Sequence, residues 1–166
     1  VRWIRMPLPI TLDHINLWAL EDGDGWTLVD TGIHCPDTIA AWDRIATDDL
    51  GGRPVKRLIV TAGAGVREEM DQPKLADKLI VRALKPFNGN VYSDMLRVVE
   101  QVKASGLDWT VVRAPMLTDD PATGHVRAGG VGKDIGTRLS RADFAAFLLA
   151  QVNNPQWVGK APAISN

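Results

Sequence analysis

The first part of the chain alternates apolar and polar positions in the manner of β-strands. Apolar residues at positions 7–20 are interspersed with polar ones, and residues 21–25 supply the acidic residues and glycines of a hairpin turn. Residues 26–29 continue as the return strand, which residues 30–32 interrupt. The pattern therefore predicts an antiparallel hairpin in this part of the chain.

A helix and a buried strand are predicted next. The helix is expected to begin near Asp37 and to end near Gly51. Its buried face is marked by apolar residues at three-residue spacing, which are Ile39, Trp42 and Ile45. Residues 56–61 contain a continuous, β-branched apolar run, which predicts a short buried strand, and the small residues at positions 62–65 then predict a turn.

The rest of the chain continues to alternate between helices and strands. Two helices are predicted at residues 73–84 and 90–105, separated by a proline-containing segment, and a strand follows at residues 108–112. Residues 116–137 are rich in glycine and proline. We expect a loop there, with a short strand at residues 125–128.

The last predicted helix carries a start signal in the sequence. Ser140 is expected to be the N-cap, and Asp143, three residues later, resembles the second member of a capping box. The buried face of this helix is expected to hold Phe144, Phe147 and Leu148. Residues 160–164 then predict a closing strand.

The alternation of strands and helices from residue 26 onward predicts an α/β fold. We expect a single, mostly parallel sheet with helices on both faces and the antiparallel hairpin at one edge. The length of 166 residues fits one domain. Apolar residues make up 45% and charged residues 23%, a globular composition that excludes disordered and fibrous proteins.

The charge balance limits the expected partners and location. The chain has 19 Lys and Arg and 20 Asp and Glu, a net charge of −1, so we expect neither nucleic acid nor a membrane as a partner. No apolar run reaches the roughly 18 residues that a membrane span needs, and no signal peptide is visible. We therefore expect a cytoplasmic protein.

Three segments of the first part share a recognisable pattern. Residues 12–18, 25–32 and 57–61 resemble the first strands and helix of a metallo-β-lactamase-fold hydrolase. In that family the strand matching residues 58–61 is followed by a His-x-His-x-Asp-His motif, which holds one or two metal ions that activate water. Here the strand is followed by Ala-Gly-Ala-Gly-Val-Arg, so this motif is absent.

The resemblance carries over only one residue, Asp30, which the family places beside its metal site. Asp30, His34, Cys35 and Asp37 include residue types that bind metal, but their spacing matches no metal signature. We therefore predict no metal site. Asp37 is equally a candidate for the N-cap of the following helix.

The remainder of the chain follows a second pattern, at residues 62–66, 89–95, 105–113 and 139–143. The string Ser-Gly-Leu-Asp-Trp-Thr-Val-Val-Arg at residues 105–113 is its most specific part. These segments resemble the C-terminal half of an NmrA-like, atypical short-chain reductase. The resemblance implies a Rossmann-like sheet of the kind that binds NAD(P)H.

The dinucleotide motif of that family is not matched either. The family cradles the pyrophosphate in a glycine-rich turn after its first strand, whereas residues 62–65 correspond to a later turn that borders the nicotinamide end. Tyr92 is followed four residues on by Leu96 instead of lysine, and Arg113 is followed by Ala114 instead of proline. We expect no full-affinity NAD(P) binding, and the cofactor stays undetermined.

The two resemblances imply a single hybrid domain. A metallo-β-lactamase-like fragment covers residues 1–61, and a Rossmann-like reductase fragment covers residues 62–166. Both families place a buried parallel strand at residues 58–61, so a fusion there preserves the strand register. The catalytic motif of neither family is present.

Three functions remain open. The first is a promiscuous hydrolase of low efficiency, with a cleft at the C-terminal ends of the strands. The cleft would be lined by Asp30, His34, Arg67 and Arg113. A carboxylate–imidazole pair would act as general base, and the arginines would stabilise developing negative charge. A hydrolase is slightly favoured over an oxidoreductase, because hydrolysis requires fewer of the catalytic elements of the two families.

The second function is a binding module for NAD(P) or a flavin nucleotide, without turnover. Its site would lie at Gly63, Gly65, Arg113 and the segment Met116–Thr118. The third is a folded hybrid with no evolved activity. A small molecule is thus the external ligand to consider, and its identity is not encoded in any intact motif.

Self-association is also expected. In the hydrolase family, the counterparts of Trp3, Trp18 and Trp26 would pack on a second sheet that has no counterpart here, whereas Trp42 and Trp109 fit the core. Exposed apolar surface and an open sheet edge both favour association between copies. We therefore predict a homodimer, with domain swapping as one form that it could take.

Overall fold

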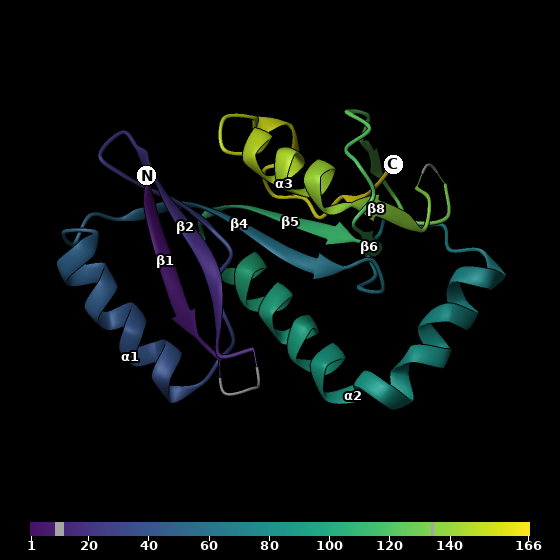
Figure 1. Ribbon diagram of the computed structural model, residues 1–166, viewed down its shortest axis with the longest axis horizontal. Helices are drawn as coiled ribbons and strands as arrows, with labels where there is room; N and C mark the ends of the chain where they lie inside the picture. The colour runs from purple at the N-terminus through teal and green to yellow at the C-terminus, as the bar shows by residue number, and fades with distance from the viewer. Residues whose placement is uncertain (9–11, 134) are drawn as a thin grey trace. The chain divides into compact units, whose positions relative to one another are not determined.

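The computed structural model describes the backbone of residues 1–8, 12–133 and 135–166, and their side chains except those of residues 76–78 and 80–91. The chain forms two compact units, Val1–Val60 and Thr61–Asn166. Each unit has its own helices and strands (Figure 1). Each also has its own buried residues.

The first unit is built on antiparallel strands that one parallel strand extends. β1 (Arg2–Pro7) pairs antiparallel with β2 (His14–Asp22), and β2 pairs antiparallel with β3 (Gly25–Val29). β3 then pairs parallel with β4 (Val55–Gly63), whose last residues belong to the second unit. The predicted hairpin is confirmed by β2 and β3, whereas β1 precedes the predicted strands. Residues 9–11 of the first predicted strand lie outside the described residues.

The two faces of the β1–β2 pair differ in burial. Ile4 lies opposite Leu17 in the strand register, and both side chains are buried. On the other face Trp3 lies opposite Trp18, and these side chains are 61% and 44% exposed. Because neighbouring residues of a strand point to opposite faces, one face forms the core of the unit and the other presents two tryptophans to solvent.

Trp26 is buried, unlike the two tryptophans opposite each other on β1 and β2. Its side chain is 2% exposed, its Nε1–H donates to the Leu50 carbonyl at 3.0 Å, and the Arg53 guanidinium lies 4.3 Å from the ring centroid. The expectation that Trp26 contributes to an exposed surface is therefore wrong. The segment that leads into β4 covers its ring within the first unit.

A helix and a wider helical turn connect β3 to β4. α1 (Pro36–Arg44) is continued by the π-helical turn η1 (Ile45–Asp49). Cys35 occupies the N-cap position with an extended backbone, so the assignment of Asp37 as N-cap is wrong. Ile45 is buried but Ile39 is 46% exposed. A six-residue separation places these side chains about 120° apart around an α-helix, which is too far for one buried face.

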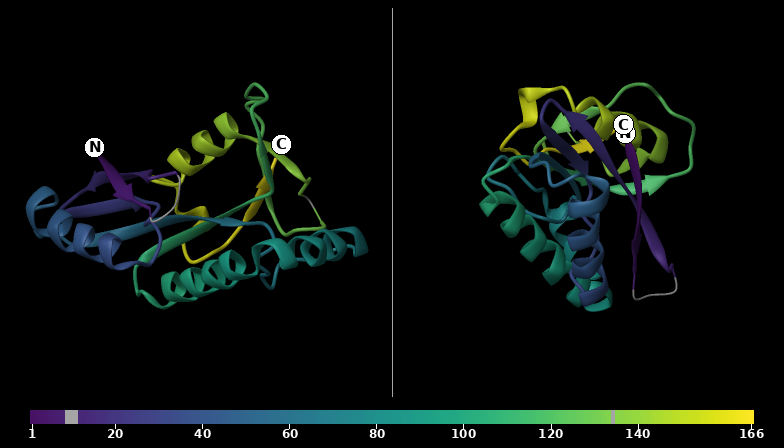
Figure 2. Two further views of the ribbon diagram at one scale, coloured as in Figure 1. Left: turned by 60° about the horizontal axis from the view of Figure 1, so that its bottom comes forward. Right: turned by 90° about the vertical axis from the view of Figure 1, so that its left-hand side faces the viewer.

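The second unit has three paired strands between two helices. β5 (Asp108–Ala114) pairs parallel with β9 (Ala163–Ser165), which pairs antiparallel with β7 (Arg127–Gly129). α2 (Leu75–Ala104) and α3 (Arg141–Ala150) lie on opposite sides of these strands (Figure 2). The core of this unit includes Val99, Val102, Val111, Val112, Leu139 and Ile164.

A small parallel sheet leads into the last helix. β6 (Met116–Thr118) pairs with β8 (Arg138–Ser140), and α3 begins directly after β8. The Asp143 N–H donates to Ser140 Oγ at 3.0 Å, and Ser140 Oγ–H donates to the Asp143 carboxylate at 2.8 Å. The predicted N-cap at Ser140 is confirmed. A short 3-10 helix, η2 (Pro155–Trp157), precedes β9.

Several predicted boundaries in the second unit are wrong. The two predicted helices form one helix, α2, which bends along its length (Figure 1). The segment read as a loop contains β6, β7 begins at Arg127, and the closing strand begins at Ala163. Turn residues in the sequence indicated breaks, but tertiary packing decided where each element begins and ends.

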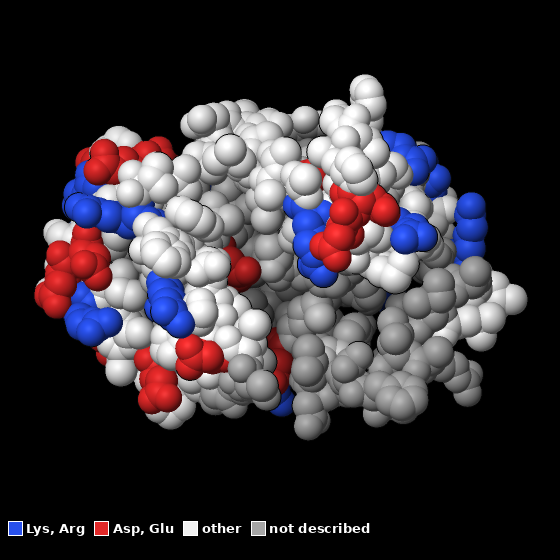
Figure 3. Space-filling view, in the orientation of Figure 1, with Lys and Arg blue, Asp and Glu red and all other residues white. Residues whose placement is uncertain are grey.

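The α/β class is confirmed: parallel strand pairs combine with helices, and an antiparallel hairpin lies at the start of the chain. Within the described residues, the structure has no helix with the length and hydrophobicity needed to cross a lipid bilayer. On the face shown in Figure 3, acidic and basic side chains are interspersed, and neither sign forms a large continuous area.

Candidate functional site

Residues 62–66, which include the last two residues of β4, form a turn that is closed by backbone hydrogen bonds; we call it the β4 turn. The Val66 N–H donates to the Gly63 carbonyl at 3.1 Å, as in a β-turn. The Ala64 N–H donates to the carbonyl of Ala114, the last residue of β5, at 2.7 Å. The C-terminal ends of β4 and β5 therefore meet at this turn.

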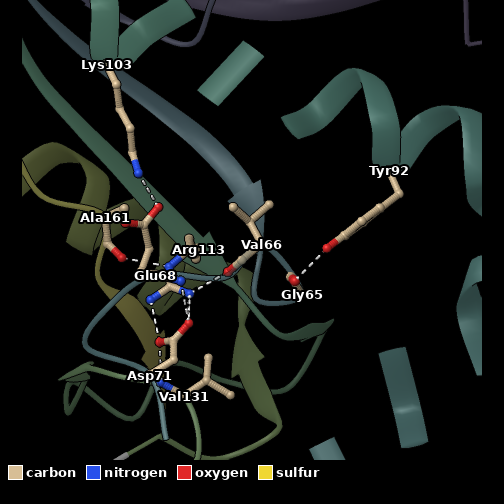
Figure 4. Close-up of polar contacts among 9 residues, drawn as sticks. All are labelled: Gly65, Val66, Glu68, Asp71, Tyr92, Lys103, Arg113, Val131 and Ala161. Atoms are coloured by element: carbon tan, nitrogen blue, oxygen red, sulfur yellow. Dashed lines mark hydrogen bonds and ion pairs between the residues drawn. The ribbon is translucent and has the colours of Figure 1, made fainter. Parts of the chain in front are cut away.

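Side chains from two other elements hold successive carbonyl groups of the β4 turn. Tyr92 on α2 donates its phenol O–H to the Gly65 carbonyl at 3.1 Å (Figure 4). Arg113 on β5 donates from Nη1 to the Val66 carbonyl at 2.6 Å. The backbone of the turn is thus fixed from α2 on one side and from β5 on the other.

Gly63 lies against the Met95 side chain at the end of β4. Its N–H donates to the thioether sulfur of Met95 at 2.9 Å. A Cβ added at Gly63 would lie 3.5 Å from the same sulfur, which is an ordinary van der Waals distance. The position therefore admits a methyl group without rearrangement of the surrounding atoms.

A buried ion pair connects β5 to the segment after the β4 turn. The Arg113 side chain is 0% exposed and the Asp71 side chain is 5% exposed. Two parallel hydrogen bonds join them, from Nη1 to Oδ2 at 2.7 Å and from Nη2 to Oδ1 at 2.8 Å. Arg113 Nε also donates to the Ala161 carbonyl at 2.6 Å. All three guanidinium nitrogens are bound to protein atoms.

Each carboxylate oxygen of Asp71 accepts a second hydrogen bond from the backbone. The Glu68 N–H donates to Oδ2 at 2.8 Å, and the Val131 N–H donates to Oδ1 at 2.9 Å. Burial acts to raise the pKa of Asp71, but the hydrogen bonds from Arg113, Glu68 and Val131 outweigh it and hold the pKa below its ordinary value. Asp71 is therefore ionised at neutral pH.

An ion pair also attaches this segment to α2. Lys103, in the last turn of α2, places Nζ 2.6 Å from Glu68 Oε1. The Glu68 side chain is only 14% exposed. The same ammonium group lies 5.9 Å from the centroid of the Trp109 ring on β5. The segment after the β4 turn is thus tied to α2 through Glu68 and to β5 through Asp71.

Two glycines allow distant loops to approach each other closely. The Gln72 N–H donates to the Val131 carbonyl at 2.9 Å. A Cβ at Gly130 would lie 2.2 Å from the Met70 carbonyl oxygen, and a Cβ at Gly132 would lie 2.1 Å from the Gln72 carbonyl oxygen. Both distances are far below van der Waals contact, so neither position accepts a side chain without backbone movement.

The structure brings three of the predicted nucleotide-site residues together. Gly63 and Gly65 belong to the β4 turn, and Arg113 is bonded to its last carbonyl group. Arg113 is buried, however, so it reaches the turn from the protein interior and presents no surface to a ligand. Arg67 directly follows the turn with an exposed side chain, and Met116–Thr118 is the strand β6.

The remaining predicted catalytic residues lie in the first unit. Asp30 has a φ of 67°, which is uncommon for a residue with a side chain, and its Oδ1 accepts the Thr31 N–H at 2.8 Å. His34 is exposed. Because Arg67 and Arg113 belong to the second unit, neither unit by itself contains the four-residue cleft expected for a hydrolase.

Candidate metal ligands do not cluster among the described residues of either unit. In the part of the chain that the structure describes, no group of three or more His, Cys, Asp and Glu side chains could hold a metal ion. Cys35 Sγ lies 3.2 Å from Thr38 Oγ1, and hydrogen bonding with Thr38 lowers the pKa of the thiol.

Asp71 and Glu68 are part of the site, but no motif in the sequence points to either residue. Arg113 gives an indirect signal, because it directly follows the β-branched apolar pair Val111 and Val112 of a predicted strand. A buried arginine needs a carboxylate partner. The sequence does not indicate which of its 20 acidic residues fills that place.

The fold resembles solved reductases. An anaerobillin reductase from Escherichia coli O157:H7 aligns at a TM-score of 0.57 and 18% identity, over 82% of this chain and 62% of its own. A putative NAD-dependent epimerase/dehydratase from Bacillus halodurans aligns at 0.54 and 23% identity, over 83% and 63%. A short-chain dehydrogenase/reductase from Veillonella parvula, in complex with NADP, aligns at 0.54 and 16% identity, over 78% and 56%.

These structures share a Rossmann-like fold with this chain, and the chain spans between 56% and 63% of their length. Residues 43–155 match the family described as NAD(P)H-binding, and the chain belongs to that family.

The first part of the chain matches a different family. Residues 10–61 match the metallo-beta-lactamase superfamily. A beta-lactamase domain protein from Burkholderia ambifaria is 48% identical over 39% of this chain and 21% of its own, with a TM-score of 0.35. No curated protein is significantly similar to the chain. Both family resemblances predicted from the sequence are confirmed.

Proposed function

We propose that the second unit binds the nicotinamide end of NAD(P)H at the β4 turn. The observation that carries this proposal is the hydrogen bond from Ala64 to Ala114, which joins the ends of β4 and β5 in a chain of the NAD(P)H-binding family. Ligands of open α/β sheets bind beyond the carboxyl ends of the strands. The β4 turn occupies such a position.

The composition of the turn favours a flat, uncharged ring. Residues 62–65 read Ala-Gly-Ala-Gly, so no long side chain from these positions covers the backbone. The space beside Gly63 admits a methyl group, as the 3.5 Å distance to Met95 indicates. Small residues let a planar ligand approach the main chain closely. NAD(P)H supplies a hydride when it is bound, but the proposal is limited to binding.

The pyrophosphate of a dinucleotide has no matching cradle in this chain. The sequence contains no GxGxxG string, the element that supplies backbone N–H groups to the pyrophosphate in Rossmann proteins. We therefore expect weaker binding of NADPH than in a reductase with that turn. For the same reason, reduced nicotinamide mononucleotide should bind nearly as tightly as NADPH.

The hydrolase hypothesis has less support than nucleotide binding. It requires Arg113 to stabilise negative charge on a substrate, but the guanidinium is 0% exposed and paired with Asp71. An arginine that is already paired and shielded from solvent cannot also serve a substrate oxygen.

Calorimetric titration of the full chain with NADPH tests the proposal. We expect saturable binding at one site, with a rise in Tm that increases with ligand concentration. Gly63→Ala should weaken NADPH binding without lowering the Tm of the free protein, since the added methyl group fits beside Met95 but leaves less room for a ring at the β4 turn. Gln101→Ala, at an exposed position of α2, is the matched control.

The outcomes separate the open functions. Saturable binding of FMN in place of NADPH would transfer the proposal to a flavin nucleotide. If NADPH, NADH and FMN all fail to bind at millimolar concentration, nucleotide binding is excluded, and a folded hybrid without an evolved ligand is the better description.

A further inference from the structure

Arg113 connects three separate segments of the second unit. Nη1 donates to the Val66 carbonyl of the β4 turn at 2.6 Å, and Nε donates to the Ala161 carbonyl at 2.6 Å. Nη1 and Nη2 together bind the Asp71 carboxylate. One side chain therefore fixes the turn, the residues before β9 and the segment that contains Asp71.

We propose that Arg113, assisted by Tyr92, is a positioning residue for the nucleotide: it sets the affinity by holding the β4 turn and does not touch the ligand. The inference rests on the proposed NAD(P)H site. With 0% exposure, the guanidinium has no surface that a ligand could reach. Its influence must pass through the Val66 carbonyl, as that of Tyr92 passes through the Gly65 carbonyl.

The planar shape of the guanidinium explains why arginine suits this position. Its donors diverge at fixed angles, so it binds Asp71 in a bidentate manner while Nη1 and Nε reach carbonyl groups of two other segments. A lysine has a single nitrogen and can hold only part of this set. Hydrogen bonds that are shielded from water are also stronger than exposed ones.

Holding the turn affects affinity through the populated fraction of the binding conformation. When the binding conformation is only partly populated, the apparent Kd rises in inverse proportion to that fraction. A turn that keeps its binding geometry for about one-tenth of the time would bind about tenfold more weakly. The number of sites would not change.

Arg113→Lys is the first variant to test, because it retains a positive charge beside Asp71. Calorimetry with NADPH should give a Kd about tenfold weaker than that of the wild type, with an unchanged stoichiometry in the folded protein. A purely structural role predicts instead a lower Tm and fewer competent molecules, with the same Kd. A change in Kd therefore indicates a positioning role for Arg113, whereas a change in stoichiometry alone indicates a role in folding.

Asn166→Ala is the matched control for lost stability. Asn166 donates to the Asp143 carboxylate at 2.7 Å, and its side-chain amide also donates to Thr123 Oγ1 and to the His125 carbonyl. This variant should lower the Tm while leaving the Kd for NADPH unchanged. An equal weakening of NADPH binding in Asn166→Ala and Arg113→Lys would overturn the inference.

A second variant and a ligand-free measurement keep the test decisive. Tyr92→Phe removes only the hydroxyl on the Gly65 carbonyl, and it should weaken NADPH binding about threefold, a smaller effect because Arg113 remains. Hydrogen exchange of a peptide covering residues 62–72 should accelerate in Arg113→Lys and not in Asn166→Ala. Unchanged Kd and exchange in both turn variants would overturn the inference even if Arg113→Lys folded poorly.

Failure of the inference and failure of the proposed function give different results. If the wild type binds NADPH and the turn variants bind it equally well, only the positioning role is wrong. If the wild type does not bind NADPH, the proposed function is wrong, and the positioning role of Arg113 is excluded with it.

Discussion

Asn166 donates from Nδ2 to the Asp143 carboxylate at 2.7 Å, joining residues that are 23 positions apart. Asp143 also accepts hydrogen bonds from the N–H of Thr123, from the Ser140 hydroxyl and from the Gly124 N–H. The bond from Thr123 is the largest cause that holds the pKa of Asp143 well below its ordinary range. The start of α3, a surface loop and the residue that follows β9 therefore meet at one ionised carboxylate.

Asn166→Asp is expected to destabilise the protein more than Asn166→Ala at pH 7. It replaces a donor with a second carboxylate beside Asp143, and the repulsion raises the pKa of the new carboxyl group. Because the new acid is harder to ionise in the folded state, it destabilises the folded protein at pH values above that pKa. This destabilisation is lost as the pH falls. Urea midpoints at pH 7 and pH 4 test this, and equal midpoints of the two variants at pH 7 would contradict it.

Asp71→Asn should remove about 3–5 kcal/mol from the free energy of unfolding at pH 7, because Arg113 is left buried and unpaired. The pKa of Asp71 is depressed in the folded state, so its stabilisation is complete above the unfolded value of about 3.9 and is lost as the pH falls further. The difference between wild type and variant should thus shrink below about pH 4. Urea unfolding over this pH range measures it; a difference that grows on acidification is the contrary result.

Gly130→Ala should destabilise the protein by about 1–3 kcal/mol, since the added methyl group overlaps a backbone oxygen that cannot turn away. That oxygen is the Met70 carbonyl, which lies 2.2 Å from the place that the new Cβ would take. Gly63→Ala is the matched control, and its cost should stay within about 0.5 kcal/mol. The midpoint of chemical unfolding compares the two, and equal midpoints would show that the loops do not approach as described.

Trp26→Phe and Trp3→Phe make the same chemical change at a buried and an exposed position. In Trp26→Phe the Leu50 carbonyl loses its donor, which should cost about 1–3 kcal/mol. Trp3 is 61% exposed, so Trp3→Phe should change stability by no more than about 0.5 kcal/mol. Thermal unfolding followed by far-UV circular dichroism ranks the variants; the opposite order would place Trp26 outside the core.

The homodimer expected from the sequence stays a prediction. Trp3 and Trp18 lie opposite each other and are both exposed, which is apolar surface available to a second copy. Size-exclusion chromatography with light scattering should give twice the mass of one chain at micromolar concentration. The double variant Trp3→Ser with Trp18→Ser should shift the mass toward one chain, and a wild type that is already a monomer would end this hypothesis.

Local signals in the sequence predicted the elements that depend on local contacts. The capping box of Ser140 and Asp143 involves residues three positions apart, and the structure contains it. The hairpin of β2 and β3 depends on the adjacent turn residues. The continuous apolar run before residue 61 also became a buried strand. In each case the residues that decide the structure are close together in the chain.

Non-local contacts explain what the sequence did not indicate. Arg113 and Asp71 are 42 residues apart, and no spacing rule connects them. The sequence therefore predicts that Arg113 binds a ligand, although its bonding partners are protein atoms. The proline-containing segment predicts a break between two helices, whereas α2 is one continuous helix. At such positions, tertiary contacts override the intrinsic helix propensity of the residues.

The long sequence separation of the contacts around the β4 turn has a consequence for synthesis of the chain. The bond from Arg113 to Asp71 closes a loop of 42 residues, and the bond from Val131 to Asp71 closes one of 60. Contacts of this kind form late, because closing a long loop costs entropy before any bond is gained. On the ribosome, the β4 turn emerges long before the residues that hold it. A nascent chain that ends before Arg113 therefore lacks the bonds that Arg113 makes to Val66 and Asp71 and the bond that Val131 makes to Asp71.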